Sequence, residues 1–209
     1  MSHLLLTGCG FNTEEIKNQF LSLIHQDTAQ LKVVIVTTGS PAKENNRHAQ
    51  KSMQDFRDMG FQHIRFVDIE FEDPHILLDQ DVVFINGGNP FALLHHARES
   101  GADEIFRTLA AQDVILIGVS AGTMVLGPNI KIVDLFTPYM NTMNLTDLQA
   151  LEITDHLIFP HYGEEERFED EAKRTIEERI AAFEAAENCQ VTRLRDEEYL
   201  LISTNPTQC

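Results

Sequence analysis

The strongest constraint on the fold of this chain is a set of short, almost uninterrupted apolar runs. Residues 82–86 and 114–119 contain no charged side chain and are rich in valine and isoleucine. Such runs are typical of strands that lie inside a parallel sheet, because helices cover both faces of that sheet. Strand-like runs alternate with amphipathic stretches along the chain, so the sequence predicts repeated βα units.

The same pattern continues over most of the chain and predicts an α/β three-layer sandwich, with a mostly parallel central sheet and helices on both faces. At 209 residues the chain fits one domain, residues 1–209. Further strands are expected at residues 4–7, 33–37 and 64–69, and helices at residues 13–25, 42–59, 90–100 and 103–112.

Residues that typically begin or end helices refine this prediction. Asn12 and Ser40 are expected to begin helices, while Gly60 and Gly101 are expected to end them in the left-handed conformation. After residue 127 the alternation of strand-like and helix-like stretches becomes less regular. There the sequence predicts loops and short strands over 128–160, one long charged helix over 164–187, and closing strands at 191–194 and 199–203.

Charge and cysteine content limit the partners and the compartment. The formal net charge of −17 comes from 33 acidic against 16 basic residues, which disfavours nucleic acid and anionic lipid as partners. No apolar stretch has the length of a membrane span, and residues 4–6 are too short for a signal peptide. Cys9, Cys189 and Cys209 are expected to be reduced thiols. We therefore expect a cytoplasmic protein, either a monomer or a small homo-oligomer.

The segment 118–122, Gly-Val-Ser-Ala-Gly, follows a predicted buried strand and precedes a helix candidate. It matches the pattern in which a serine on a sharp strand-to-helix turn acts as a nucleophile. Ser120 is the predicted nucleophile, and the amide of Ala121 would face a developing oxyanion. The alternative is that Ser120 only caps a helix.

A second glycine turn, residues 86–91, connects another central strand to another helix. Its two glycines allow a close approach of the backbone, so Gly88 is a candidate for the second oxyanion donor. Asn89 is a candidate for substrate binding. An ordinary turn with Asn89 as a helix cap is the alternative.

A serine nucleophile needs a general base, which is normally a histidine. His161 ends the apolar run 157–159 and precedes a turn, which is where α/β sheets carry catalytic groups. An exposed loop histidine is the alternative interpretation. The other histidines lie in less informative contexts, and those considered individually are His48, His63, His75, His95 and His96.

A third residue, an acid, would hold the histidine in the required tautomer. Spacing alone does not choose between the candidates. They are Asp134, Asp147, Asp155, Asp196, Glu197 and Glu198.

Taken together, these segments resemble peptidase E and its relatives, which include cyanophycinase and share a fold similar to class I glutamine amidotransferases. The likeness rests on residues 4–7, 85–91, 118–122 and 160–162. It implies a serine peptidase without a metal or organic cofactor. By this resemblance Ser120 is the nucleophile and His161 the base, with the amides of Gly88 and Ala121 as the oxyanion hole. Asp196 is then the expected acid, with Glu197 and Glu198 as alternatives.

The resemblance also implies a small peptide substrate with a free amino terminus, and in that family an amino-terminal Asp. Arg167 is the one basic residue of the loop 163–167 and the expected partner of a substrate carboxylate. Three glutamates precede it and are expected to face solvent at the start of a helix. Two other interpretations stay open: an esterase that uses Asp134 or Asp147, and a non-catalytic binding protein.

Overall fold

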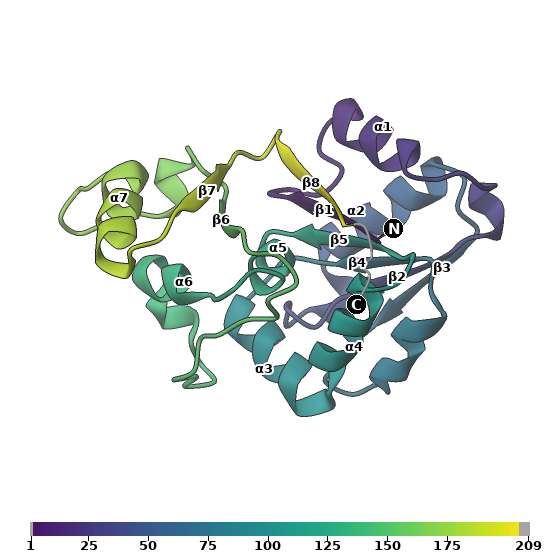
Figure 1. The fold of residues 1–209 in the computed structure, drawn as a ribbon, viewed down its shortest axis with the longest axis horizontal. Coiled ribbons are helices and arrows are strands. Elements are labelled where there is room, and N and C mark those ends of the chain that lie inside the picture. Colours follow the sequence, from purple (N-terminus) through teal and green to yellow (C-terminus); the bar gives the residue numbers. More distant parts are fainter. Residues whose placement is uncertain (1, 205–209) are drawn as a thin grey trace.

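The computed structural model describes residues 2–204; the predicted thiol of Cys209 lies outside the described residues. Its centre is a six-stranded sheet with the order β3-β2-β4-β5-β1-β8, in which only β8 runs antiparallel to its neighbour (Figure 1). The predicted, mostly parallel sheet is therefore confirmed. The strands are β1 (Ser2–Thr7), β2 (Lys32–Val36), β3 (His63–Val67), β4 (Val82–Ile85), β5 (Ile115–Val119) and β8 (Tyr199–Thr204).

Helices cover both faces of this sheet, and each face has its own apolar core. On one face, Phe56 of α2 packs between Phe20 of α1 and Phe84 of β4, and all three belong to one apolar cluster. On the other face, α3, α4 and α5 pack against alternate residues of the same strands. The helices are α1 (Glu14–Ser22), α2 (Arg47–Asp58), α3 (Pro90–Ser100), α4 (Ala102–Ala110) and α5 (Ala121–Val125).

Beside this sheet lies a smaller unit in which β6 (Leu157–Pro160) and β7 (Val191–Leu194) form a two-stranded parallel sheet (Figure 1). Two more helices, α6 (Lys131–Phe136) and α7 (Ile176–Glu187), pack in the same region. Short 3-10 helices complete the described chain at Thr28–Gln30, Lys43–Asn45, Pro74–Asp79, Pro138–Met140 and Glu165–Arg167.

Several predicted boundaries in and around this unit were wrong. The region 128–160 contains the helix α6, which the loop prediction missed. The long helix predicted over 164–187 is a 3-10 turn, a loop and then α7, because Thr175 forms a capping box with Glu178 and starts the helix there.

Two predicted helix starts also shift. Thr13 rather than Asn12 caps α1, and Asn46 rather than Ser40 caps α2, since each side chain accepts a hydrogen bond from an amide of the first turn. The predicted stops are confirmed, because Gly60 and Gly101 have φ angles of +93° and +78°. Within residues 2–204, none of the helices combines the length and apolar character that a membrane span requires.

Candidate active site

Ser120 lies on a sharp turn between β5 and α5, at the carboxyl end of a central strand. Its φ of 50° and ψ of −109° are a strained conformation for a residue with a side chain. The Ser120 amide donates to Thr7 O at 3.0 Å, and the Thr123 hydroxyl donates to the same oxygen at 2.9 Å. The turn is therefore held against β1 by buried hydrogen bonds.

The glycines on either side of Ser120 explain why this turn is possible. A Cβ on Gly122 would lie 2.2 Å from Ile85 O, and a Cβ on Gly118 would lie 2.8 Å from Thr123 Cα. Both positions therefore require glycine, as the sequence pattern indicated.

The register of the small sheet positions His161. Strands β6 and β7 run parallel with Pro160 opposite Leu194, and the Tyr162 amide donates to Leu194 O at 3.1 Å. Because parallel strands end at the same edge, His161 and the residues after Leu194 are brought side by side. His161 is buried and has a φ of 61°.

Asp196 lies in the turn between β7 and β8, and its Oδ1 is 2.6 Å from His161 Nδ1. On the other side of the ring, His161 Nε2 is 2.8 Å from Ser120 Oγ. Gly8 allows this approach, since a Cβ there would lie 2.9 Å from Asp196 Oδ1. Three segments distant in sequence therefore form one continuous hydrogen-bond chain.

The other candidate acids have different surroundings. Glu198 accepts the Arg195 amide at 2.9 Å and so shapes the turn, and Glu197 is exposed. Asp147 pairs with Arg98 at 3.1 Å. The carboxylates of Asp134 and Asp155 belong to exposed residues.

The protonation of His161 is set by its environment. Burial lowers the pKa of the imidazole below its usual 6.5, and the positive charge of Arg167 lowers this pKa further, while Asp196 acts in the opposite direction. A net lowered pKa keeps the ring neutral near pH 7, and a neutral imidazole is the form that accepts a proton.

Gly88 and Ala121, the predicted oxyanion donors, lie in two turns near Ser120. Gly88 has a φ of +143°, and a Cβ there would lie 2.1 Å from Gly39 O. Ala121 begins α5 directly after Ser120, so its amide has no acceptor within the helix. Asn89 is different: its side chain accepts the Phe91 amide at 2.9 Å and donates to Met140 O at 2.6 Å. This geometry favours helix capping over substrate binding for Asn89.

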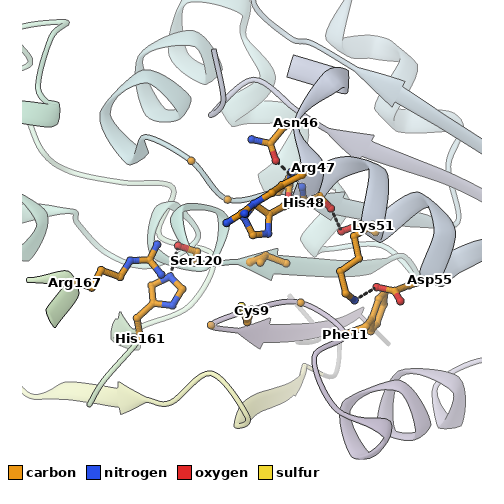
Figure 2. Close-up of a pocket in the computed structure, with 17 residues that line it drawn as sticks. Cys9, Phe11, Asn46, Arg47, His48, Lys51, Asp55, Ser120, His161 and Arg167 are labelled. Carbon is orange, nitrogen blue, oxygen red and sulfur yellow. Dashed lines mark hydrogen bonds and ion pairs between the residues drawn. The ribbon is translucent and has the colours of Figure 1, made fainter. Parts of the chain in front are cut away.

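A cavity of about 330 Å³ opens beside Ser120 (Figure 2), and we call it the basic pocket because Arg47, His48, Lys51 and Arg167 line it. The loop 8–11, residues 86–88 of the glycine turn, and Asn46, Ser52 and Asp55 also line it. Lys51 pairs with Asp55 at 2.6 Å. In the part of the chain that the structure describes, no carboxylate lies within ion-pair distance of Arg47 or Arg167.

The basic residues of α2 were not among the predicted site residues, and the sequence around His48 gave no indication of a functional role. A signal was present, because a helix that follows a parallel strand begins at the edge of the sheet where Ser120 lies. The helix was predicted to start near Ser40, so its basic residues were not expected in the first turn at that edge. Arg167 lines this pocket, and the preceding glutamates Glu164–Glu166 are exposed as expected. They do not begin a long helix, however, because Glu165 and Glu166 lie in the 3-10 turn Glu165–Arg167.

A second cavity, of about 240 Å³, opens on another side of the same serine. We call it the apolar pocket. It shares Gly88, Ser120, His161 and Arg167 with the basic pocket. Its remaining walls are mainly apolar and are formed by Pro90, Met124, Val133, Phe136, Thr137, Tyr139, Met140, Phe159, Pro160 and Phe168.

A parallel α/β sheet with a serine, a histidine and a carboxylate in contact at its carboxyl edge is the arrangement of an α/β serine hydrolase. Residues 4–208 match the model of peptidase family S51, and the chain belongs to this family of serine-type peptidases.

Individual relatives agree with this assignment. An uncharacterized peptidase of Listeria monocytogenes is 26% identical over 167 residues, which cover 78% of this chain and 79% of that protein. Peptidase E of Streptomyces coelicolor is 28% identical over 131 residues, or 62% of this chain and 52% of that protein. Among solved structures, a Listeria monocytogenes EGD-e protein has a TM-score of 0.73 at 21% identity, with 98% of this chain and 100% of that chain covered. A peptidase from an acI-B1 Actinobacterium has a TM-score of 0.60 at 16% identity, with 97% and 83% covered, and both likenesses concern the fold.

Proposed function

We propose that this peptidase is a dipeptidase that acts on small peptides with a free amino terminus, with Ser120 as nucleophile, His161 as base and Asp196 as the orienting acid. The observation that carries the proposal is the hydrogen-bond chain from Ser120 Oγ through the imidazole to Asp196, with distances of 2.8 Å and 2.6 Å. Both distances suit proton transfer and tautomer control.

In this mechanism His161 Nε2 takes the proton of Ser120 as Oγ attacks the peptide carbonyl. The amides of Gly88 and Ala121 stabilise the oxyanion of the tetrahedral intermediate. The imidazolium then gives its proton to the leaving amine, and water hydrolyses the acyl-enzyme with His161 again as base. Asp196 accepts the hydrogen bond from Nδ1 throughout and stabilises the transient positive charge.

We further propose that the residue before the scissile bond is acidic, and that its carboxylate binds in the basic pocket. The charge of the pocket supports this, because the chain carries a net charge of −17 and yet gathers Arg47, Lys51 and Arg167 around the serine. An arginine without an internal carboxylate partner is suited to bind one from a substrate.

Hydrolysis of a dipeptide panel tests the proposal. We expect aspartyl dipeptides to be cleaved, and we expect Ser120→Ala to abolish cleavage while the fold is retained, as judged by circular dichroism. Ser22→Ala, at an exposed serine of α1, is the matched control and keeps full activity. Cleavage that survives Ser120→Ala would refute the nucleophile, and ester turnover without any dipeptide turnover would refute the dipeptidase.

A further inference from the structure

The apolar pocket is a cavity whose walls include packed aromatic side chains. Phe136, Phe159 and Phe168 form a ring cluster, with the centroids of Phe136 and Phe159 4.4 Å apart. The guanidinium of Arg179 lies 3.8 Å from the centroid of Phe136. Arg179 also donates to Phe168 O and to Leu135 O, each at 2.9 Å. The contacts of Arg179 therefore fix the aromatic walls of the pocket, and a pre-formed wall reduces the entropy cost of binding.

The position of this pocket relative to the reacting atoms indicates what it binds. It opens onto Ser120 and His161, so a group inside it is connected to the scissile bond by a short link. Its volume of about 240 Å³ lies below the roughly 300–1,000 Å³ of typical small-molecule sites, which suits one side chain. An apolar wall stabilises an apolar side chain by removing its surface from water.

The two pockets differ in chemistry, and this sets the direction of the substrate. If the acidic residue before the scissile bond occupies the basic pocket, the residue after the bond is directed to the apolar pocket. The leaving amine must also lie near His161, which protonates it. Phe159 and Pro160, which precede His161 on β6, both line the apolar pocket.

We propose that the apolar pocket is the binding site for a bulky apolar side chain, aromatic or branched aliphatic, on the residue that follows the scissile bond. The preferred substrates are then dipeptides that pair an acidic first residue with an apolar second one. This inference rests on the proposed dipeptidase function and names the second half of its substrate.

Comparison of kcat/KM for Asp-Phe, Asp-Leu and Asp-Ala tests the proposal on the wild-type protein. We expect Asp-Phe and Asp-Leu to exceed Asp-Ala by at least about 10-fold, the selectivity that burial of a large apolar side chain provides. Equal values would overturn the apolar site. A higher value for Phe-Asp than for Asp-Phe would overturn the assigned direction.

Two substitutions in α6 test whether the preference for Asp-Phe over Asp-Ala arises in the apolar pocket. Val133→Phe fills the pocket and should reduce the ratio of Asp-Phe to Asp-Ala at least about 10-fold. Leu135→Phe is the matched control, since Leu135 is 38% exposed and its side chain does not line the pocket, and it should keep the wild-type ratio.

A third variant covers the case in which the buried Val133 does not tolerate phenylalanine. Tyr139 lines the pocket and is 77% exposed, so Tyr139→Ala preserves the core and should lower the same ratio. An unchanged ratio in this variant and in folded Val133→Phe would refute the site. If Asp-Ala is cleaved as well as Asp-Phe, and Ser120→Ala abolishes both, the apolar site fails while the proposed function stands. If no aspartyl dipeptide is cleaved, both fail.

Discussion

At the scale of single residues, the proposed role of Ser120 as nucleophile depends on a histidine whose charge is controlled by its neighbours. Burial and Arg167 lower the pKa of His161, and Asp196 opposes them. The base must be neutral to act, so kcat/KM should rise with pH along an acid limb that lies below pH 6.5.

Arg167→Gln tests this electrostatic coupling. Loss of the positive charge removes one cause of the lowered pKa of His161, so the acid limb of kcat/KM should move to higher pH. The pH profile separates this effect from weaker substrate binding, which lowers kcat/KM without moving the limb. A limb that stays in place or moves to lower pH would contradict the coupling.

At the scale of elements, strand ends and glycine turns bring the site together. The ends of β5, β6 and β7 supply Ser120, His161 and Asp196, while the turn after β4 supplies Gly88. This turn packs directly against the turn after β2, and any side chain at Gly88 would meet Gly39 O.

Gly88→Ala should therefore move the turn and lower kcat by about 10² to 10³-fold, the loss that follows removal of one oxyanion donor. Gly101→Ala is the matched control, because Gly101 also has a positive φ, of +78°, but an added Cβ there meets no atom within 4 Å. Both variants lose stability through backbone strain, which thermal unfolding measures. Only the first should lose turnover, and equal kcat values in the two variants would argue against Gly88 as a donor.

The sequence predicted the elements that have strong local signals. Buried runs such as residues 82–86 and the small residues around Ser120 identify strands and turns because the chain permits few alternatives there. The contact of His161 with Asp196 was not derivable from spacing, since it depends on the register of β6 against β7. The basic residues of α2 were missed because a cap at Asn46 decides where that helix begins.

At the scale of the whole molecule, the net charge of the chain and the local charge of the basic pocket have opposite signs. The net charge of −17 favours solubility, whereas Arg47 and Arg167 give the pocket a local positive charge. The strained turn at Ser120 is a second global property, because its cost is part of the free energy of unfolding of the entire fold.

Replacement of Ser120 by glycine or by alanine measures this strain. In the interior of a helix or strand, alanine gives the more stable protein of the two, by roughly 0.5–1 kcal/mol. At a φ of 50° and ψ of −109° the order should reverse, because glycine tolerates this conformation and strain of this kind costs about 1–3 kcal/mol. Chemical denaturation gives both free energies of unfolding. A more stable alanine variant would show that the turn is not strained.

The central claim is that Ser120, His161 and Asp196 act as one unit, and the rate of phosphonylation of Ser120 by a fluorophosphonate measures it directly. We predict a single labelled residue, Ser120, and a labelling rate that falls by orders of magnitude in Asp196→Asn but not in Glu197→Gln, a matched change in the same turn. Labelling at another residue, or a rate that Asp196→Asn leaves unchanged, would contradict the account.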